Sequence, residues 1–386
     1  MTGGGSGGHI TPILAVAREL KKLQPDVEIV YVGQKGDRLA DIPANDPNID
    51  KVYSVRAGKF RRYHGVGLRQ LLDIPTLFKN IRDAFYVLIG IWQSFWLLKK
   101  IKPAVIFTRG GFVSVPVAFG ATLGHIPYVT HDSDSTPSLA NRIIARRAVL
   151  HTVALPKEIY PYPLAKTVTV GVPIQDSFSL VDAVAQEKYR AAIGFAAYRK
   201  VLFVTGGGLG ALRLNDAVIN IASALLQKFP DLAIVHNVGR MHEADVNQAY
   251  DTSVAPEQRS RVAVKGFVTD LYNYSGAADV IITRAGGSSL AEFAAQGKAC
   301  IIVPNPQLTG GHQTKNAQAL VAQNAVLVVD ESQLKTDALA LQHAVEQLFQ
   351  NETERQTLGV NLAKLAHPAA ARELAVLLLE QTKTAT

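Results

Sequence analysis

The first residues that could do chemistry lie at the very start of the chain, where a glycine-rich turn is followed by a histidine. The run Gly3–Gly8 leads into His9, and after Pro12 the apolar residues recur at helical spacing. A glycine turn that feeds a helix presents free backbone amides and the positive end of the helix dipole to an anion. His9 is the side chain of this turn that exchanges a proton near neutral pH. The pattern predicts an anion-binding turn with a general base, and an ordinary turn with a solvated histidine is the alternative.

Two later stretches repeat this arrangement of strand, glycine turn and helix. The apolar run 201–204 leads into the glycine turn 205–211, and the run 278–283 leads into the turn 284–289. Three such turns in the two halves of one chain predict an α/β protein of two doubly wound, Rossmann-like domains that face a ligand cleft.

Polar residues follow two further predicted strands. Arg109, Gly110, Gly111 and Phe112 come after the strand 104–107, and the tetrapeptide 131–134, His-Asp-Ser-Asp, comes after the strand 128–130. An Asp-x-Asp pair can hold a divalent cation against a diphosphate. Because Asp and Ser are also common in turns and at helix N-caps, we favour the turn over a metal site.

A basic and aromatic region lies in the first half of the chain. Arg56, Lys59, Arg61 and Arg62 precede the apolar run 84–98, which contains Trp92 and Trp96. With 15 residues the run is shorter than the roughly 20 needed to cross a bilayer. The simpler interpretation of this run is a core helix. The more specific one is a helix that partly embeds in an anionic membrane surface.

Composition limits the class of protein. The chain has 386 residues, is 48% hydrophobic, and its net charge of +8 favours an anionic partner. Few aromatic residues alternate with the basic ones, so we expect no nucleic-acid partner. The single cysteine, Cys300, allows no disulfide framework and indicates a reducing compartment.

The domain boundaries follow from the order of predicted elements. We expect a first domain over 1–173, a second over 174–366, and a final helix within 367–386 that packs on the first domain. A doubly wound domain opens with a strand of about five residues, yet only Met1 and Thr2 precede Gly3. We expect that the recorded start lies downstream of the natural one, in preference to a domain without its first strand.

Taken together, the motifs resemble those of the MurG family within glycosyltransferase family 28. They are the stretches Gly3–Pro12, Arg109–Ser114, Gly206–Asn215, Ala285–Glu292 and His312–Ala317, in this order. Each motif alone is weak, but the joint set is specific and covers essentially the whole chain. The family has the GT-B fold, and it transfers N-acetylglucosamine from UDP-N-acetylglucosamine (UDP-GlcNAc) to an undecaprenyl-linked N-acetylmuramyl-pentapeptide during peptidoglycan synthesis.

The resemblance implies a role for each matching residue. His9 would be the general base that deprotonates the acceptor hydroxyl. The residues implied in donor binding are Ser6, Gly7, Gly8, Gly208, Asn215, Phe267, Val268, Gly286, Gly287, Ser288, Ser289, Glu292, His312, Gln313 and Asn316. Those on the acceptor side are Gly110, Gly111, Phe112, His131, Asp132 and Asp134, and those at the membrane are Arg61, Arg62, Trp92 and Trp96. The reaction would be inverting, would need neither cofactor nor metal, and would occur at the cytoplasmic face of the cell membrane.

Departures from the family pattern leave alternatives open. Leu209 stands in a turn where the family has a polar residue, residues 131–134 replace His-Glu-Gln-Asn, and Phe112 replaces a tyrosine. These changes put the acceptor in more doubt than the donor. A diacylglycerol glycosyltransferase, a UDP-GlcNAc 2-epimerase and a non-catalytic nucleotide-binding subunit are the alternatives. The basic region argues against the epimerase, and the presence of His9, Glu292 and Gln313 argues against the non-catalytic subunit.

Overall fold

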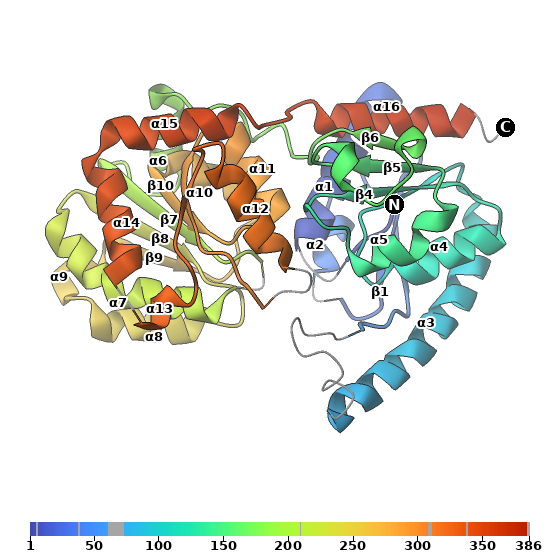
Figure 1. The fold of residues 1–386 in the computed structure, drawn as a ribbon, viewed down its shortest axis with the longest axis horizontal. Coiled ribbons are helices and arrows are strands. Elements are labelled where there is room, and N and C mark those ends of the chain that lie inside the picture. The colour runs from blue at the N-terminus through green and yellow to red at the C-terminus, as the bar shows by residue number, and fades with distance from the viewer. Residues whose placement is uncertain are drawn as a thin grey trace. The chain divides into compact units, whose positions relative to one another are not determined.

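The structure, a computed structural model, describes residues 1–4, 7–37, 39–60, 73–208, 210–307, 311–336 and 339–383. The chain forms two compact units (Figure 1). Unit 1 contains Met1–Asp176, Gln307–His312 and His367–Thr386, and unit 2 contains Ser177–Pro306 and Gln313–Ala366. The chain therefore crosses between the units close to the predicted boundary at 173/174 and enters unit 1 again at its C-terminal end.

Unit 1 is built on a parallel sheet that the first residues of the chain complete. Its strands are β1 (Val30–Gln34), β2 (Lys51–Val55), β3 (Ile106–Thr108), β4 (Tyr128–Asp132), β5 (Leu150–Val153) and β6 (Thr167–Thr169). β1 pairs with β2, and β3 to β6 pair in sequence order. Thr2 forms parallel bridges to both Val32 and Thr108, so it joins the two groups into one order, β2-β1-Thr2-β3-β4-β5-β6.

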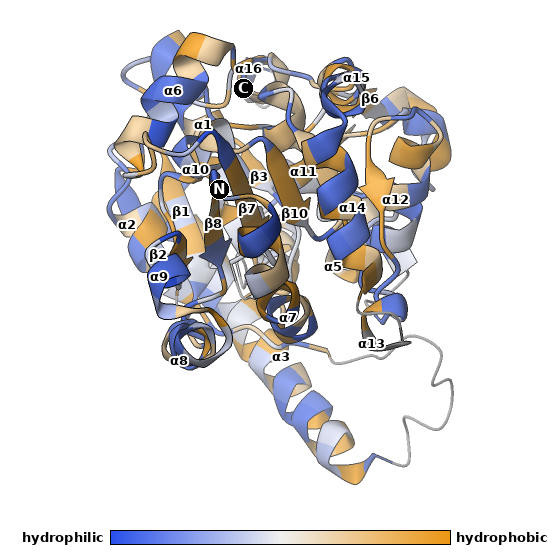
Figure 2. Cartoon of the chain, turned by 90° about the vertical axis from the view of Figure 1, so that its left-hand side faces the viewer, coloured by the Kyte–Doolittle hydropathy of each residue, from blue (hydrophilic) through white to orange (hydrophobic). Residues whose placement is uncertain are grey.

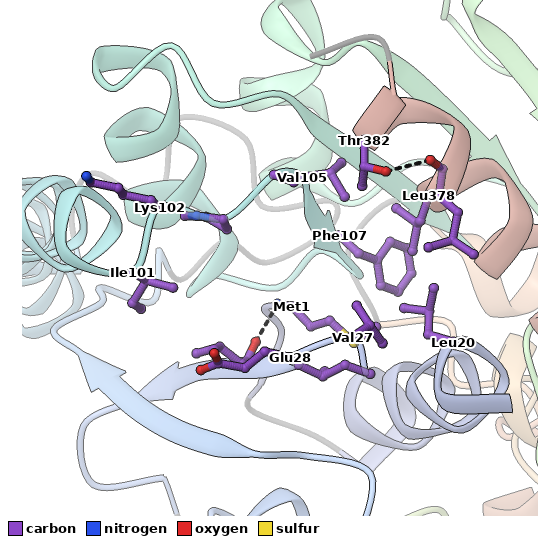
Figure 3. Close-up of a pocket in the computed structure, with 15 residues that line it drawn as sticks. Met1, Leu20, Val27, Glu28, Ile101, Lys102, Val105, Phe107, Leu378 and Thr382 are labelled. Carbon is purple, nitrogen blue, oxygen red and sulfur yellow. Dashed lines mark hydrogen bonds between the residues drawn. The ribbon is translucent and has the colours of Figure 1, made fainter. Parts of the chain in front are cut away.

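Met1 and Thr2 therefore occupy the place of the predicted first strand. The Thr2 amide donates to the Phe107 carbonyl at 2.9 Å, and the Val32 amide donates to the Met1 carbonyl at 2.9 Å. A cavity of about 270 Å³ begins at Met1, between the start of β1, the start of β3 and the C-terminal helix α16 (Figure 3). Apolar side chains such as Val27, Phe107 and Leu378 line it (Figure 3).

Helices cover both faces of this sheet. They are α1 (Gly7–Leu23), α2 (Asp41–Ala44), α3 (Ile74–Ile101), α4 (Ser114–Leu123), α5 (Leu139–Ile144) and α16 (Ala370–Lys383). Ile13 and Val16 of α1 pack with Leu374 and Leu378 of α16 against one face. Val113 and Val117 near α4 pack with Leu98 of α3 against the other.

Two elements of unit 1 differ from the predicted ones. α1 begins at Gly7 instead of Pro12, so His9 lies in the first helical turn, and the Thr11 hydroxyl supports that turn by donating to the Gly7 carbonyl at 3.3 Å. β4 extends to Asp132 and draws the tetrapeptide 131–134 partly into the sheet. Helix α5 ends at Ile144, and β5, which starts at Leu150, pairs with β4.

Helix α3 packs through small residues and leaves its large ones outside. Its buried positions are Thr76, Asp83, Gly90, Ser94 and Leu98. A Cβ atom on Gly120 of α4 would lie 2.8 Å from the Ser94 Cβ atom, so the two helices approach closely there. The N-terminal half of α3 extends beyond the other elements of unit 1 (Figure 1).

Unit 2 is a six-stranded parallel sheet within its described residues, in the order β12-β11-β10-β7-β8-β9. Its strands are β7 (Lys200–Thr205), β8 (Leu232–Asn237), β9 (Val262–Lys265), β10 (Val280–Thr283), β11 (Ala299–Ile302) and β12 (Leu327–Val328). The central strands are buried on both faces, as expected for a parallel sheet covered by helices.

The helices of unit 2 divide between the two faces. They are α6 (Ala183–Ala192), α7 (Leu212–Lys228), α8 (Glu243–Ser253), α9 (Pro256–Arg259), α10 (Leu271–Ala277), α11 (Gly287–Ala295), α12 (His312–Val321), α13 (Gln333–Thr336), α14 (Leu339–Gln350) and α15 (Glu352–Ala363). Leu202 and Val204 point to the face covered by α7, α8 and α14, whereas Val201 and Phe203 point to the face covered by α11 and α12. This alternation along β7 creates the doubly wound arrangement.

We predict that position 90 accommodates only glycine without a backbone shift, because α3 closely approaches the chain after β2 there. A Cβ atom there would lie 1.9 Å from the Arg56 carbonyl oxygen. Gly90→Ala should therefore lower the free energy of unfolding of unit 1 by about 1–3 kcal/mol, because backbone must shift to make room. Thermal denaturation of the full chain measures this. Leu88→Ala, at an exposed position of the same helix, is the control, and equal stability of the two variants would contradict the prediction.

Candidate active site

The topology of each sheet determines where a ligand can bind. In open parallel sheets the crevice lies at the carboxyl ends of the strands, where the strand order reverses direction. In unit 2 the chain moves from β7 to β8 on one side and reaches β10 on the other. In unit 1 it moves from Thr2 to β1 on one side and to β3 on the other. The turns after Thr2 and β3, and those after β7 and β10, therefore frame the two candidate half-sites.

His9 is held in unit 1 by the backbone of the turn after β3. Its Nδ1 atom lies 3.2 Å from the Arg109 carbonyl oxygen, and because a carbonyl only accepts, Nδ1 is the protonated nitrogen. The other nitrogen, Nε2, is left as the basic atom. Burial, and to a smaller extent the charge of Arg109, lowers the pKa of His9 to about 4. The imidazole is therefore neutral at physiological pH, as a general base must be.

The turn after β3 adopts a backbone conformation that suits glycine. Gly110 and Gly111 have φ angles of +82° and +80°. The Thr108 hydroxyl accepts from the Gly110 amide at 3.2 Å, and the Ser114 hydroxyl donates to the Gly110 carbonyl at 2.6 Å. A Cβ atom on Gly111 would lie 3.8 Å from Cδ2 of His9, so this turn borders the imidazole. Phe112, the next residue, is half-buried.

The tetrapeptide after β4, expected on the acceptor side, makes hydrogen bonds within unit 1. His131 is fully buried, and its Nδ1 donates to the Thr152 hydroxyl at 3.1 Å. The Asp132 carboxylate accepts from the Tyr162 hydroxyl at 2.7 Å and from the Ser138 amide at 3.1 Å. Asp134 is half-exposed. Both His131 and Asp132 therefore shape the loop from inside, because β4 extends into the sheet at these positions.

The half-site of unit 2 begins with two turns whose backbone faces open space. A Cβ atom on Gly207 or on Gly286 would meet no atom within 4 Å. The Thr205 hydroxyl accepts from the Gly207 amide at 3.2 Å, the same i to i+2 contact that Thr108 makes in unit 1. Helix α11 starts directly after Gly286 and contains Gly287, Ser288 and Ser289 in its first turn. The amides of this turn and the helix dipole can bind an anion.

Glu292 on α11 is a buried carboxyl group without a partner in the described part of the chain. It is 7% exposed, and no hydrogen bond or ion pair reaches its side chain from the described residues. Burial raises the pKa of Glu292 to about 8. A buried acceptor of this kind is suited to a ligand that brings hydroxyl donors.

An aromatic and cationic pair follows β8 and β9. The Arg240 guanidinium lies 4.7 Å from the ring centroid of Phe267. Phe267 and Val268 are half-buried in the loop after β9, where a planar base can stack on the ring and bond to the backbone. No motif in the sequence indicated a role for Arg240. A cation directly after a glycine at the end of a buried strand is nevertheless a pattern that could indicate a binding residue.

Several of the polar residues expected at the donor make hydrogen bonds to the loops of unit 2. Asn215 is fully buried, and its amide donates to the Val238 carbonyl at 3.1 Å. Gln313 accepts from the Asn305 amide at 2.9 Å, and Asn316 donates to the Ala285 carbonyl at 3.0 Å. These side chains fix the ends of β8, β10 and β11. His312 is half-buried at the start of α12. Gly7 and Gly8 lie in the first turn of α1 and Gly208 in the turn after β7, while Ser6 and Leu209 lie outside the described residues.

A buried ion-pair network supports the turn after β10, and the sequence analysis missed it. The Arg284 guanidinium donates to the Val303 carbonyl at 2.9 Å and to the Glu331 carboxylate. Arg213 donates to the other oxygen of Glu331 at 3.0 Å. Because Glu331 is distant in sequence from both arginines, no local pattern reveals the network.

The outer face of α3 exposes large apolar side chains next to cations. Phe78 is 69% exposed and Trp92 is 64% exposed. Trp92 and Trp96 contact each other edge to face at 5.6 Å, and Lys99 lies over the Trp96 ring. Figure 2 shows hydrophobic and hydrophilic residues alternating along this exposed helix. Arg61 and Arg62 lie outside the described residues.

The described residues contain neither a candidate membrane-spanning helix nor a candidate metal site. None of the helices there is long and apolar enough to cross a membrane. No three His, Cys, Asp or Glu side chains in that part of the chain gather so that they could hold a metal ion.

Comparison with known structures defines the class of the fold. MurG from Acinetobacter baumannii superposes with a TM-score of 0.68 at 23% identity, over 98% of both chains. A UDP complex of MnaA from S. aureus superposes with a TM-score of 0.66 at 11% identity, over 100% of this chain and 96% of that one. Each unit has a parallel sheet covered by helices, with glycine turns where the strand order reverses direction. Two such units make up the GT-B fold.

Sequence comparison then gives the family. The N-terminal domain of glycosyltransferase family 28 matches residues 1–150, and the C-terminal domain of the same family matches residues 201–374. The chain belongs to glycosyltransferase family 28 and is an enzyme of the hexosyltransferase type. Relatives from Bacillus pumilus, 30% identical over 100% of this chain and 99% of theirs, and from Bacillus licheniformis, 29% identical over 97% and 96%, are similar along their full length. Both are named UDP-N-acetylglucosamine--N-acetylmuramyl-(pentapeptide) pyrophosphoryl-undecaprenol N-acetylglucosamine transferase.

We predict that the raised pKa of Glu292 makes stability depend on pH. The folded protein holds this proton up to about pH 8, whereas the unfolded chain releases it near its ordinary value, so the stabilising contribution is lost as pH rises through 8. Glu292→Gln should therefore gain stability relative to wild type, by on the order of 1–3 kcal/mol, between pH 6 and pH 9. Thermal denaturation over this range measures the gain.

The control is Glu346→Gln. In the wild type, the hydrogen bond from Lys228 lowers the pKa of Glu346, so the ionised carboxylate stabilises the fold at neutral pH. The Glu346→Gln variant should therefore lose stability. A Glu292→Gln variant that follows the wild-type pH profile would contradict the prediction.

Proposed function

We propose that this protein transfers N-acetylglucosamine from UDP-GlcNAc to an undecaprenyl-linked N-acetylmuramyl-pentapeptide, with inversion at the anomeric carbon. The observation on which this depends is the similarity to relatives with that name over the full length of both chains. It covers both half-sites, including His9 in unit 1 and Glu292 in unit 2.

Unit 2 would bind the donor. The uracil stacks on Phe267 and bonds to the backbone near Val268, the diphosphate binds the amides at the start of α11, and the ribose hydroxyls donate to Glu292. Each step uses a feature of the unit: a half-buried aromatic ring, the open glycine turn at the start of α11, and a buried carboxyl group without a partner among the described residues. The α11 amides take up the charge that develops on the diphosphate, so we propose that the reaction needs no metal. Gln313 and Asn316 act by holding the loops around this site.

Unit 1 would supply the acceptor and the base. The acceptor C4 hydroxyl gives its proton to Nε2 of His9 as its oxygen attacks the anomeric carbon, and UDP leaves from the opposite face of the sugar. The Nδ1–H bond to the Arg109 carbonyl keeps Nε2 free of its own proton. Negative charge on the acceptor diphosphate raises the basicity of the imidazole when the substrate is bound.

The exposed face of α3 would dock on an anionic membrane, at the cytoplasmic side where the lipid-linked acceptor is presented. Its apolar side chains enter the interface, and Arg56, Arg82, Lys99 and Lys100 meet the headgroups. The support is the arrangement of α3 itself, whose small residues face the protein and whose aromatic residues face outward.

We predict that two alanine variants separate donor binding from chemistry. Glu292→Ala should raise the KM for UDP-GlcNAc at least tenfold and weaken UDP binding, because the ribose hydroxyls lose their buried hydrogen-bond partner. His9→Ala should lower kcat by about 10² or more with little change in UDP affinity. Steady-state kinetics with lipid-linked acceptor, together with calorimetry of UDP binding, measure both effects. Near-normal turnover of His9→Ala would remove that residue from the mechanism.

We predict that docking depends on the aromatic residues of α3. The double variant Trp92→Ala/Trp96→Ala should lose most of its binding to vesicles that contain phosphatidylglycerol, whereas UDP affinity should be unchanged because the donor site lies in unit 2. Vesicle co-sedimentation measures the loss. Val360→Ser, which removes an exposed apolar side chain from α15, is the control. Equal binding of all three proteins would show that α3 is not the membrane surface.

A further inference from the structure

A buried arginine lies beside the imidazole of His9, in the turn that holds it. Arg109 is 5% exposed, and its carbonyl oxygen is the partner of His9 Nδ1. A guanidinium is always charged and is seldom buried without a function or a counter-charge. The family resemblance assigns this side chain no role.

The guanidinium is fixed by a directional chain of hydrogen bonds. Arg109 Nη2 donates to the Ser133 hydroxyl, which lies 3.4 Å from Nε2 of His131. His131 Nδ1 lies 3.1 Å from the Thr152 hydroxyl, which donates to the Thr130 carbonyl at 3.0 Å. The first donor is a cation and the last acceptor is a carbonyl. The donor and the acceptor of every hydrogen bond in this series are therefore fixed. His131 must be neutral for this order, and burial lowers its pKa well below the ordinary value.

The charges around His9 come from two elements of unit 1. Arg109 follows β3 and disfavours a proton on His9, whereas Asp134, in the loop after β4, favours one. Asp134 and Asp132 are also the main negative charges that act on Arg109. The Tyr160 hydroxyl donates to the Asp134 carbonyl at 3.0 Å and so supports this loop. Asp37, whose carboxylate would lie 3.1 Å from a Cβ atom on Gly4, is a further charge near the glycine turn.

We propose that Arg109 is a positioning residue for His9, held by the chain through Ser133, His131 and Thr152 and opposed by Asp134. Its backbone selects the tautomer with a free Nε2, and its guanidinium keeps that nitrogen unprotonated until a substrate brings negative charge. The tetrapeptide 131–134 then acts on the reaction through Arg109, without touching the acceptor. The consequence for turnover rests on the proposed role of His9, whereas the effect on His9 itself does not.

Titration of His9 tests the proposal without turnover. The full chain is labelled at histidine ¹³Cε1, and the signal that is absent from His9→Asn identifies the residue. In the ligand-free protein we expect His9 to titrate about one pH unit higher in Arg109→Gln and measurably lower in Asp134→Asn, with Arg109→Lys close to wild type. Arg142→Gln, which removes an exposed arginine of the same unit, should leave the titration unchanged.

Kinetics separates this proposal from the proposed function. Arg109→Gln should move the acid limb of the kcat/KM profile to higher pH by about the same amount as the titration of His9, with the KM for UDP-GlcNAc unchanged. If His9 titrates identically in wild type, Arg109→Gln and Asp134→Asn, the proposal is wrong. Should Arg109→Gln fail to fold, the opposite shift in Asp134→Asn decides the question. If the titrations shift as expected but His9→Ala keeps its activity, the positioning is correct and the proposed base is wrong.

Discussion

Both half-sites depend on one constraint, the requirement that parallel strands place all their carboxyl ends at the same edge of a sheet. At this edge the backbone must turn sharply from a buried strand into a helix, and its amides need partners. Thr108 and Thr205 meet this need in the same way, each accepting from an amide two residues later. Glycine at the turn then leaves the helix N-terminus accessible to a ligand. The chemistry of each unit is therefore placed by the topology of its sheet, before any catalytic side chain is chosen.

The charged groups at these edges are controlled mainly by burial. Glu292 lies beyond the first turn of α11 and is deep enough to hold its proton, whereas His9 lies in the first turn of α1 and is deep enough to lose one. Both groups are thus uncharged in the ligand-free protein at neutral pH, although their ordinary pKa values differ. An uncharged carboxyl and an uncharged imidazole cost less to bury than their ionised forms.

Much of this architecture could be predicted from the sequence. The apolar runs before Gly206 and Gly286 indicated buried parallel strands, and the order of the turns indicated two doubly wound units. Local patterns failed where distant contacts decide the outcome. α1 starts at Gly7, where His9 in its first turn contacts the distant Arg109 carbonyl, and β4 extends to Asp132 because β5 pairs with it. Asn215 and His131 have the residue types of ligand contacts, but only the packing shows that both are fully buried. The partners of Arg109 and Arg284 lie 24 and 47 residues away in sequence, beyond any local motif.

The contact between α1 and α16 joins the first helix of the chain to the last one. Leu374 and Leu378 belong to the same apolar cluster as Ile13 and Val16, while the whole of unit 2 lies between them in sequence. Proteins are synthesised from the N-terminus, and domains generally fold as units while the chain emerges. Unit 2 can complete its core as soon as Ala366 has left the ribosome, but unit 1 lacks part of its own until α16 follows. The domain that is made first is thus the one that finishes folding last, and its apolar face on α1 stays uncovered throughout translation of the other.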